Sequence, residues 1–326
     1  MINYILIFLL LFVLEMVYLK IAKIKNIKDN PNHRSAHTTP TIRGGGIIIP
    51  MSIILYLLFY NNPTQFLYFF SGVILVAIVS FIDDLIMLSS KTRLLTHLLA
   101  LVLMFFGLGL FDEISLQNIL FLFFLTVFSI GFLNIYNFMD GINGITFLNA
   151  LASYSTLLYL NNYYQNFTDN YLLVVLILAI LVFGFFNFRK KAICFAGDIG
   201  SITIGFSLLY FVLQLYLKTE NHLVFLIFGT YLLDGGWTII ERIYRKENIF
   251  EAHKRHLYQL LVNDLKIPHL LVSSYYFFIQ LLISIILIYL IKLETYSIIG
   301  VLSVFIFLSL AYLVTKVKII KKITKT

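Results

Sequence analysis

Five polar patches with chemically reactive side chains interrupt an otherwise apolar sequence of 326 residues. They hold carboxylates, histidines, arginines and glycines, which are residue types that bind phosphate groups and divalent cations. Each patch lies at one end of an apolar run, so the elements formed by those runs must bring the patches together. The patches are HRSAHTTPTIRGGG at 33–46, IDDL at 82–85, NFMDGINGI at 137–145, FAGDIGS at 195–201 and AHKRHLYQ at 252–259.

Carboxylates in two patches are candidate metal ligands. Asp83 and Asp84 close an apolar run, and adjacent residues on a helix point about 100° apart, so one can face a metal while the other meets a different partner. Asp198 lies among glycines before another run, where we expect Ser201 to cap a helix whose free amides bind phosphate. Mg²⁺ is typically held by one or two carboxylates plus substrate phosphates. The alternatives are solvated acids at a membrane boundary and an ordinary capped loop.

The other patches carry weaker signals. Asp140 and Asn143 can turn back onto backbone amides, which would be turn chemistry alone. His253 and His256 are spaced to share one face of a helix, and basic neighbours such as Arg255 suit a diphosphate. The alternative for that loop is contact with lipid headgroups.

Two further polar residues are candidates for a site. Arg43, directly before three glycines, suits an oxyanion. Asp234 lies inside an apolar run and must face protein or water, either as a structural hydrogen-bonding residue or as part of a site.

Composition fixes the class of protein. The chain is 60% hydrophobic and 12% charged, about half the charge of a soluble domain. We predict an all-α polytopic integral membrane protein with a single catalytic domain over residues 1–326. Its lone cysteine, Cys194, excludes an internal disulfide, and we expect it to be a buried apolar residue. Eleven predicted spans, each about long enough to cross hydrocarbon, cover residues 2–19, 44–60, 66–82, 94–110, 118–136, 144–160, 170–187, 199–217, 223–241, 271–291 and 296–315.

Positive charge is divided unequally between the connections. Of 24 Lys and Arg residues, 22 fall on one set of connections and only Lys218 and Lys292 on the other. The positive-inside rule then predicts an external N-terminus and a cytoplasmic C-terminus. This topology explains the net charge of +8 without nucleic acid as a partner. The predicted cytoplasmic segments are 20–43, 83–93, 137–143, 188–198, 242–270 and the tail 316–326.

The five patches, in this order, resemble those of the polyprenyl-phosphate N-acetylhexosamine-1-phosphate transferases, over roughly residues 33–259. IDDL alone is unspecific, but NFMDGINGI, FAGDIGS and the HKRHLYQ loop together in one chain are highly specific. The resemblance implies transfer of a sugar-1-phosphate from a UDP-N-acetylhexosamine to undecaprenyl phosphate with release of UMP. It implies a bacterial inner membrane, a cytoplasmic active site and Mg²⁺, with Mn²⁺ as an alternative ion. A homodimer is left open.

The resemblance also assigns roles to matching positions. Asp198 would be the principal Mg²⁺ ligand, together with Asp83. One residue of the pair Asp83 and Asp84 would deprotonate the lipid phosphate or act as a nucleophile, and we favour direct in-line attack assisted by Asp83. Phe195 would stack on uracil, and the histidines would contact the diphosphate and sugar. The remaining residues expected to bind substrate or its phosphates are Asn137, Asp140, Asn143, Asn187, Arg43, Lys91 and Arg255.

Two departures from the family pattern bear on the role of one residue and on the branch of the family that the chain resembles. Asn143 replaces the second Asp of the usual DG-x-DG, which leaves a hydrogen-bonding role at that position. The loop reads HKRHLYQ rather than consecutive histidines, which favours the branch that starts O-antigen, capsule or other envelope glycans over the phospho-N-acetylmuramoyl-pentapeptide transferases. A membrane transporter is the alternative from another class, and it would place ionisable groups at mid-bilayer, where Asp234 is the candidate.

Overall fold

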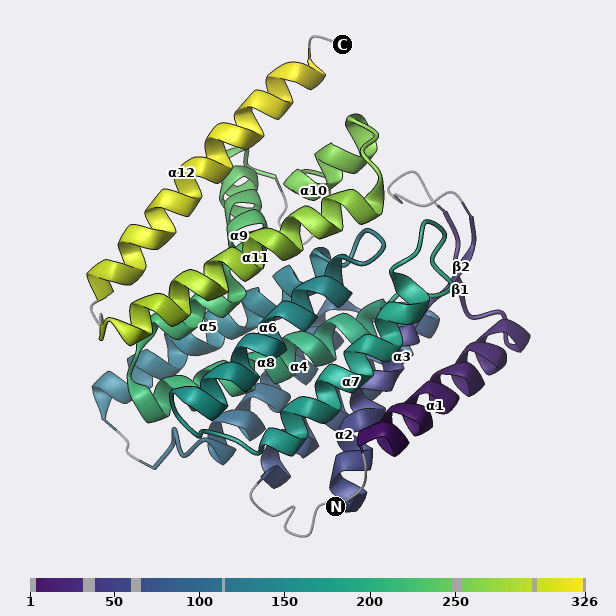
Figure 1. The fold of residues 1–326 in the computed structure, drawn as a ribbon, viewed down its shortest axis with the longest axis horizontal. Coiled ribbons are helices and arrows are strands. Elements are labelled where there is room, and N and C mark those ends of the chain that lie inside the picture. The colour runs from purple at the N-terminus through teal and green to yellow at the C-terminus, as the bar shows by residue number, and fades with distance from the viewer. Residues whose placement is uncertain are drawn as a thin grey trace.

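The computed structural model describes residues 4–31, 39–59, 66–112, 115–247, 254–294 and 298–324. This part of the chain is almost entirely helical (Figure 1). Its α-helices are α1 (Tyr4–Ile24), α2 (Ile48–Phe59), α3 (Leu67–Ile86), α4 (Ser90–Gly107), α5 (Leu116–Phe138), α6 (Ile145–Tyr163), α7 (Asn170–Asn187), α8 (Gly197–Thr219), α9 (Gly229–Tyr244), α10 (Leu257–Gln259), α11 (His269–Lys292) and α12 (Ile298–Ile323). The 3-10 segments Gly45–Ile47 and His222–Phe228 lead into α2 and α9, and a π-helical segment, Leu260–Asp264, follows α10.

Among the described residues, each predicted span overlaps a helix, and the spans 44–60 and 223–241 each combine a 3-10 segment with an α-helix. Within the described residues, nine helices are long and apolar enough to cross a membrane. The apolar segment Gly45–Phe59 is shorter, and α6 carries Asn149, Asn161 and Asn162 among its apolar residues. The chain is therefore a multi-pass membrane protein, and the count of eleven spans stays a prediction.

Helix α8 occupies the centre of the bundle and is buried along most of its length. It packs against α3, α5, α2 and α6. Backbones approach most closely at Gly46 and Gly200, where a Cβ added to Gly46 would lie 2.2 Å from the Gly200 Cα. Only glycine permits this contact, and it brings the start of α2 against the start of α8.

The outer helices expose their apolar side chains. Large hydrophobic residues are exposed along α1, α5, α11 and α12, for example Leu6, Phe124, Phe278 and Phe307. An exposed apolar surface of this extent is what a lipid-facing surface requires.

The polar patches gather at one end of the bundle. There, strand β1 (Lys28–Asp29) pairs antiparallel with β2 (Thr41–Ile42), and Ile42 forms a further bridge to Cys194. In Figure 1 the two strands lie at the right, near one end of α1, and α10 lies nearer the top centre, above α11. Cys194 is fully buried, as predicted, and burial raises the pKa of its thiol well above the usual value.

Candidate active site

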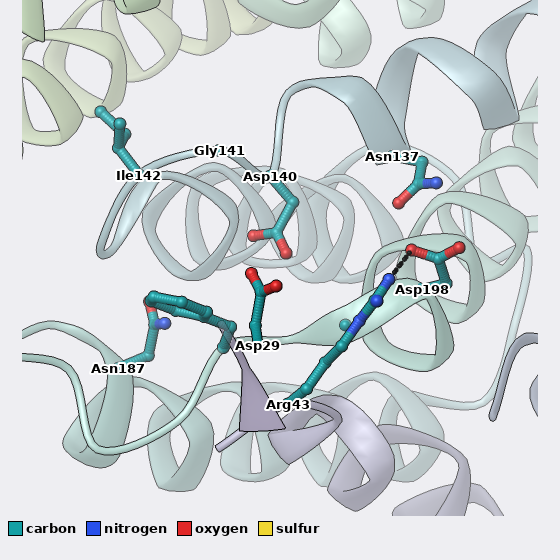
Figure 2. Close-up of a pocket in the computed structure, with 10 residues that line it drawn as sticks. Asp29, Arg43, Asn137, Asp140, Gly141, Ile142, Asn187 and Asp198 are labelled. Carbon is teal, nitrogen blue, oxygen red and sulfur yellow. Dashed lines mark hydrogen bonds and ion pairs between the residues drawn. The ribbon is translucent and has the colours of Figure 1, made fainter. Parts of the chain in front are cut away.

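A cavity of about 270 Å³ opens among these helix ends. Below it is called the large cavity, and its volume is near the lower end for small-molecule sites, roughly 300 Å³. Figure 2 shows side chains from segments far apart in the sequence around it. Its lining residues are Asp29, Arg43, Asn137, Asp140, Gly141, Ile142, Asn187, Phe195, Gly197 and Asp198.

Asp84 caps the first turn of α8 from a neighbouring helix. Its Oδ1 accepts a hydrogen bond from the Asp198 amide at 2.9 Å, and its Oδ2 accepts one from the Ile199 amide at 3.1 Å. Ala196, the residue before α8, provides no side-chain cap. The prediction that Ser201 caps this helix is wrong, because α8 already begins at Gly197 and the Ser201 hydroxyl donates to Asn137 Oδ1 at 2.7 Å.

Gly197 makes this capping geometry possible. Its φ is +70°, and a Cβ there would lie 2.4 Å from Asp84 Oδ2. A side chain would therefore be both strained and in collision with the capping carboxylate. The glycine of the FAGDIGS patch allows α8 to begin directly against Asp84.

Arg43 joins two of the acids. Its Nε lies 2.6 Å from Asp84 Oδ1, and its Nη2 lies 3.2 Å from Asp198 Oδ1, the contact drawn in Figure 2. The Asp84 side chain is fully buried, whereas that of Asp198 is partly exposed. Asp84 therefore lies behind the cavity and holds Arg43 and Asp198 at its wall.

Asp83 faces a second, small cavity of about 20 Å³. Its carboxylate accepts a hydrogen bond from the Leu88 amide and lies 3.4 Å from Arg93 Nη1. Asp198 and Asn137 line both cavities, so they form the wall between them. The other residues lining the small cavity are Val79, Ser80, Arg93, His97, Asn134 and Ile202.

The small cavity holds oxygen donors of the kind that bind Mg²⁺, with Arg93 and His97 also in its lining. About 10–15 Å³ is enough for one water molecule, so its volume admits a single small ligand. Two carboxylates and the side-chain amides of Asn134 and Asn137 provide the oxygen donors that Mg²⁺ prefers. Across the described part of the chain, no group of three or more His, Cys, Asp or Glu side chains forms a complete metal cage. A Mg²⁺ here would take its remaining ligands from water and substrate phosphates.

Asp140 and Asp29 face each other across the large cavity (Figure 2). Burial raises the pKa of Asp140 to about 6, while a hydrogen bond from Thr146 opposes part of this rise. Asp29 was missed by the sequence analysis. The available signal was that it is the only acid in the strongly basic segment 20–43.

Two asparagines tie the α5–α6 turn to the α7–α8 connection. Asn187 accepts from the Gly144 amide at 2.7 Å and donates to the Cys194 carbonyl at 2.9 Å. Asn143 donates to the Arg189 and Lys190 carbonyls at 2.8 and 3.3 Å. Asn187 lines the large cavity, whereas Asn143 is not among its lining residues.

The Asn143 contacts explain why this position carries an amide. A carboxylate has no hydrogen to donate, so an aspartate at 143 would place a negative charge against two carbonyl oxygens. The substrate-binding role expected for Asn143 gains no support from this placement.

The chain is similar to known transferases. The model of glycosyl transferase family 4 matches residues 66–216. A Bacillus subtilis protein named a probable undecaprenyl-phosphate N-acetylglucosaminyl 1-phosphate transferase is 26% identical over 249 residues, which cover 72% of this chain and 69% of that protein. A phospho-N-acetylmuramoyl-pentapeptide-transferase of Streptococcus pyogenes serotype M12 is 28% identical over 205 residues, which cover 55% of this chain and 60% of that protein.

Residues 66–216 of the chain are similar to glycosyl transferase family 4. The family match runs from the start of α3 almost to the end of α8. It therefore includes Asp83, Asp140 and Asp198, but not β1, β2 or the loop before α10. The alignment with the streptococcal transferase covers less than two thirds of that protein.

Lys91 and Arg255, which were also predicted to bind substrate, lie away from the two cavities. Lys91 is exposed on α4, and Arg93 is the basic residue of that turn that reaches Asp83. Arg255 pairs with Glu247 at 2.8 Å and with Glu241 at 3.4 Å, and it lines a different cavity.

The histidine motif is described only in part. His256 is buried at the start of α10, with its Nδ1 3.5 Å from Asp234 Oδ1. His253 lies outside the described residues. Phe195 does line the large cavity, where its backbone is fixed by bonds to Ile42 and Gly45.

Proposed function

We propose that the protein transfers N-acetylhexosamine-1-phosphate from a UDP-sugar to undecaprenyl phosphate and releases UMP. The observation that carries the proposal is the shared wall between the two cavities. Asp198 faces both a cavity of nucleotide scale and a small oxygen-lined cavity that also holds Asp83. A diphosphate at the rim of the large cavity would therefore lie beside a cation site.

Residues of the large cavity bind the donor in this proposal. Phe195 provides an aromatic face for uracil, and Asn187 keeps the cavity wall in place through its two backbone bonds. Arg43 offers positive charge to the diphosphate while Asp84 holds its guanidinium. Asp83 and Asp198 would hold a Mg²⁺, whose charge offsets the negative charge that develops on the transferring phosphate groups.

The reaction itself is an in-line displacement at phosphorus. The second pKa of a phosphomonoester is about 6, so the acceptor phosphate is already largely dianionic at pH 7. One of its oxygens attacks the phosphorus that carries the sugar. The bond from that phosphorus to the bridging oxygen breaks, and UMP leaves with that oxygen. Asp83 holds Arg93 and would hold the cation when it is bound, and it forms no covalent intermediate in this proposal.

We further propose that the site faces the cytoplasm of a bacterial inner membrane. The support is the excess of Lys and Arg on the connections at this end of the bundle. The product would start an O-antigen, capsule or other envelope glycan, as the departure from consecutive histidines favours. Asp234, the candidate for a transporter, accepts hydrogen bonds from the Leu257 amide and the Tyr276 and Tyr312 hydroxyls, so it is engaged in structural contacts.

The test is an assay of UMP release by the purified protein. The reaction contains undecaprenyl phosphate, Mg²⁺ and one of a panel of UDP-sugars, with Asp198→Asn as the disabled variant. Asp112→Asn is the matched control, since Asp112 is an exposed acid at the other end of the bundle. We expect UMP from at least one UDP-N-acetylhexosamine with the wild type and the control only. Failure of every UDP-sugar, or full activity in Asp198→Asn, would overturn the proposal.

A further inference from the structure

One face of α9 carries a ladder of polar residues that the proposed reaction does not use directly. Asp234, Thr238 and Glu241 are spaced four and three residues apart, so they lie on the same side of the helix. Asp234 and Thr238 are almost completely buried. Polar groups buried in this way are stable only when they are partnered, so the partners show what this face holds in place.

Asp234 binds three separate elements. Its oxygens accept hydrogen bonds from the Leu257 and Tyr258 amides of α10, at 2.9 and 3.3 Å. They also accept from the Tyr276 hydroxyl of α11 at 2.5 Å and the Tyr312 hydroxyl of α12 at 2.9 Å. One carboxylate therefore joins the segment 254–259 to the last two helices of the chain.

Lys316 makes a second connection one turn further along α12. Its side chain is buried, and its Nζ lies 2.9 Å from Glu241 Oε2 and 3.1 Å from Thr238 Oγ1. The other oxygen of Glu241 lies 3.4 Å from Arg255. The C-terminal helix thus reaches the segment 254–259 through both ends of the α9 ladder.

The segment in turn contacts the α5–α6 turn, part of which lines the large cavity. The Tyr258 hydroxyl donates to the Phe138 carbonyl at 2.8 Å, two residues before Asp140. A displacement of α10 would therefore move His256 and Arg255 relative to the turn that carries Asp140.

We propose that Asp234 and Lys316 are positioning residues, through which α12 and the polar face of α9 hold the segment 254–259 against the α5–α6 turn of the active site. This inference rests on the proposed transferase function. Neither residue lines the large or the small cavity, so both act through the segment. The C-terminal helix is accordingly part of the catalytic apparatus, although the family match ends in α8.

Two conservative variants test the inference. Tyr312→Phe removes only the hydroxyl bound to Asp234, and Lys316→Met removes only the charge bound to Glu241. Their matched controls are Tyr289→Phe and Lys318→Met, because Tyr289 and Lys318 are exposed on α11 and α12. All four proteins are purified at full length and compared with the wild type.

Three measurements separate positioning from general stability. Trypsin cleavage after Lys254 and Arg255 reports the mobility of the segment, the turnover number reports catalysis, and binding of UMP reports the large cavity. Loss of a hydrogen bond to a buried charge changes an equilibrium constant, here that between the held and the released segment, by roughly tenfold or more. We expect about tenfold faster cleavage and about tenfold lower turnover in Tyr312→Phe and Lys316→Met, with UMP binding within about twofold of wild type.

The outcomes also distinguish this inference from the proposed function. Wild-type cleavage and turnover in both test variants, equal to their controls, would overturn it. Equal losses in cleavage resistance, turnover and UMP binding would also overturn it, since they indicate general unfolding. If Lys316→Met does not fold, Tyr312→Phe decides the matter alone. If the wild type releases no UMP, the proposed function fails, while the cleavage rates still decide whether α12 holds the segment.

Discussion

Asp83 and Asp84 are neighbours in sequence, but their contacts predict opposite consequences of removing their charges. In Asp84→Asn, the amide can still accept from one of the two α8 amides, but its own NH₂ group faces the other. The variant also loses the ion pair with Arg43. Loss of a bond from a buried carboxylate costs about 1.5–3 kcal/mol, and loss of a helix cap costs about 0.5–2 kcal/mol. We expect destabilisation of about 2–4 kcal/mol.

Asp83→Asn should instead lose activity and keep nearly all of its stability. Asparagine can still accept from the Leu88 amide, and the Arg93 partner is 40% exposed, so the ion pair contributes at most about 1 kcal/mol to stability. Its loss of negative charge toward the small cavity should instead remove most catalysis. The two variants therefore separate a structural acid from a catalytic one.

The assay pairs thermal unfolding in detergent with UMP release at saturating substrates. Asp84→Asn should unfold at a clearly lower temperature, and Asp83→Asn should unfold near the wild-type temperature with activity lost. The reasoning is refuted if Asp84→Asn unfolds with the wild type, or if Asp83→Asn is the less stable of the two.

Three further changes test other parts of the site. Gly197→Ala should lower both stability and UMP release, because its Cβ would collide with Asp84 at a positive φ; a wild-type unfolding temperature would contradict this. Asn143→Asp should destabilise the protein by about 1–3 kcal/mol, since it faces two carbonyl oxygens, and normal unfolding would show that these bonds are not needed. Since the pKa of Asp140 is raised to about 6, its carboxyl gains a proton as pH falls through 6. The KM for the UDP-sugar should then rise in the wild type but not in Asp140→Asn, and parallel pH profiles would exclude this carboxylate from donor binding.

Sequence alone predicted that five patches would meet, and residues of four of them line the two cavities, whereas no described residue of the fifth, 252–259, does. Long apolar runs define spans, and alternating spans bring every second connection to one side of the membrane. Arg43, Asp140 and Asp198 were all expected to act together, and the structure does place them around one cavity. The position of these residues around the cavity does not test what each one does in the reaction, so their roles stay predictions.

The contacts of individual side chains could not be predicted because they depend on packing between distant elements. Asp84 caps a helix that begins 113 residues later, and no spacing rule describes a cap from another helix. Arg255 was expected at a phosphate, but α9 places Glu241 beside it. Asp29 was missed because a single acid in a basic segment is a weak signal, until strand pairing brings it to the cavity.

The central claim is that Asp83 and Asp198 hold one cation at the wall between the two cavities. The most direct measurement is a double-mutant cycle of Asp83→Asn and Asp198→Asn, read as Mg²⁺-dependent UMP release. Residues that act as a unit give strongly non-additive losses, so the double variant should be about as inactive as either single variant. Losses that multiply independently, or substantial activity in either single variant, would contradict the claim.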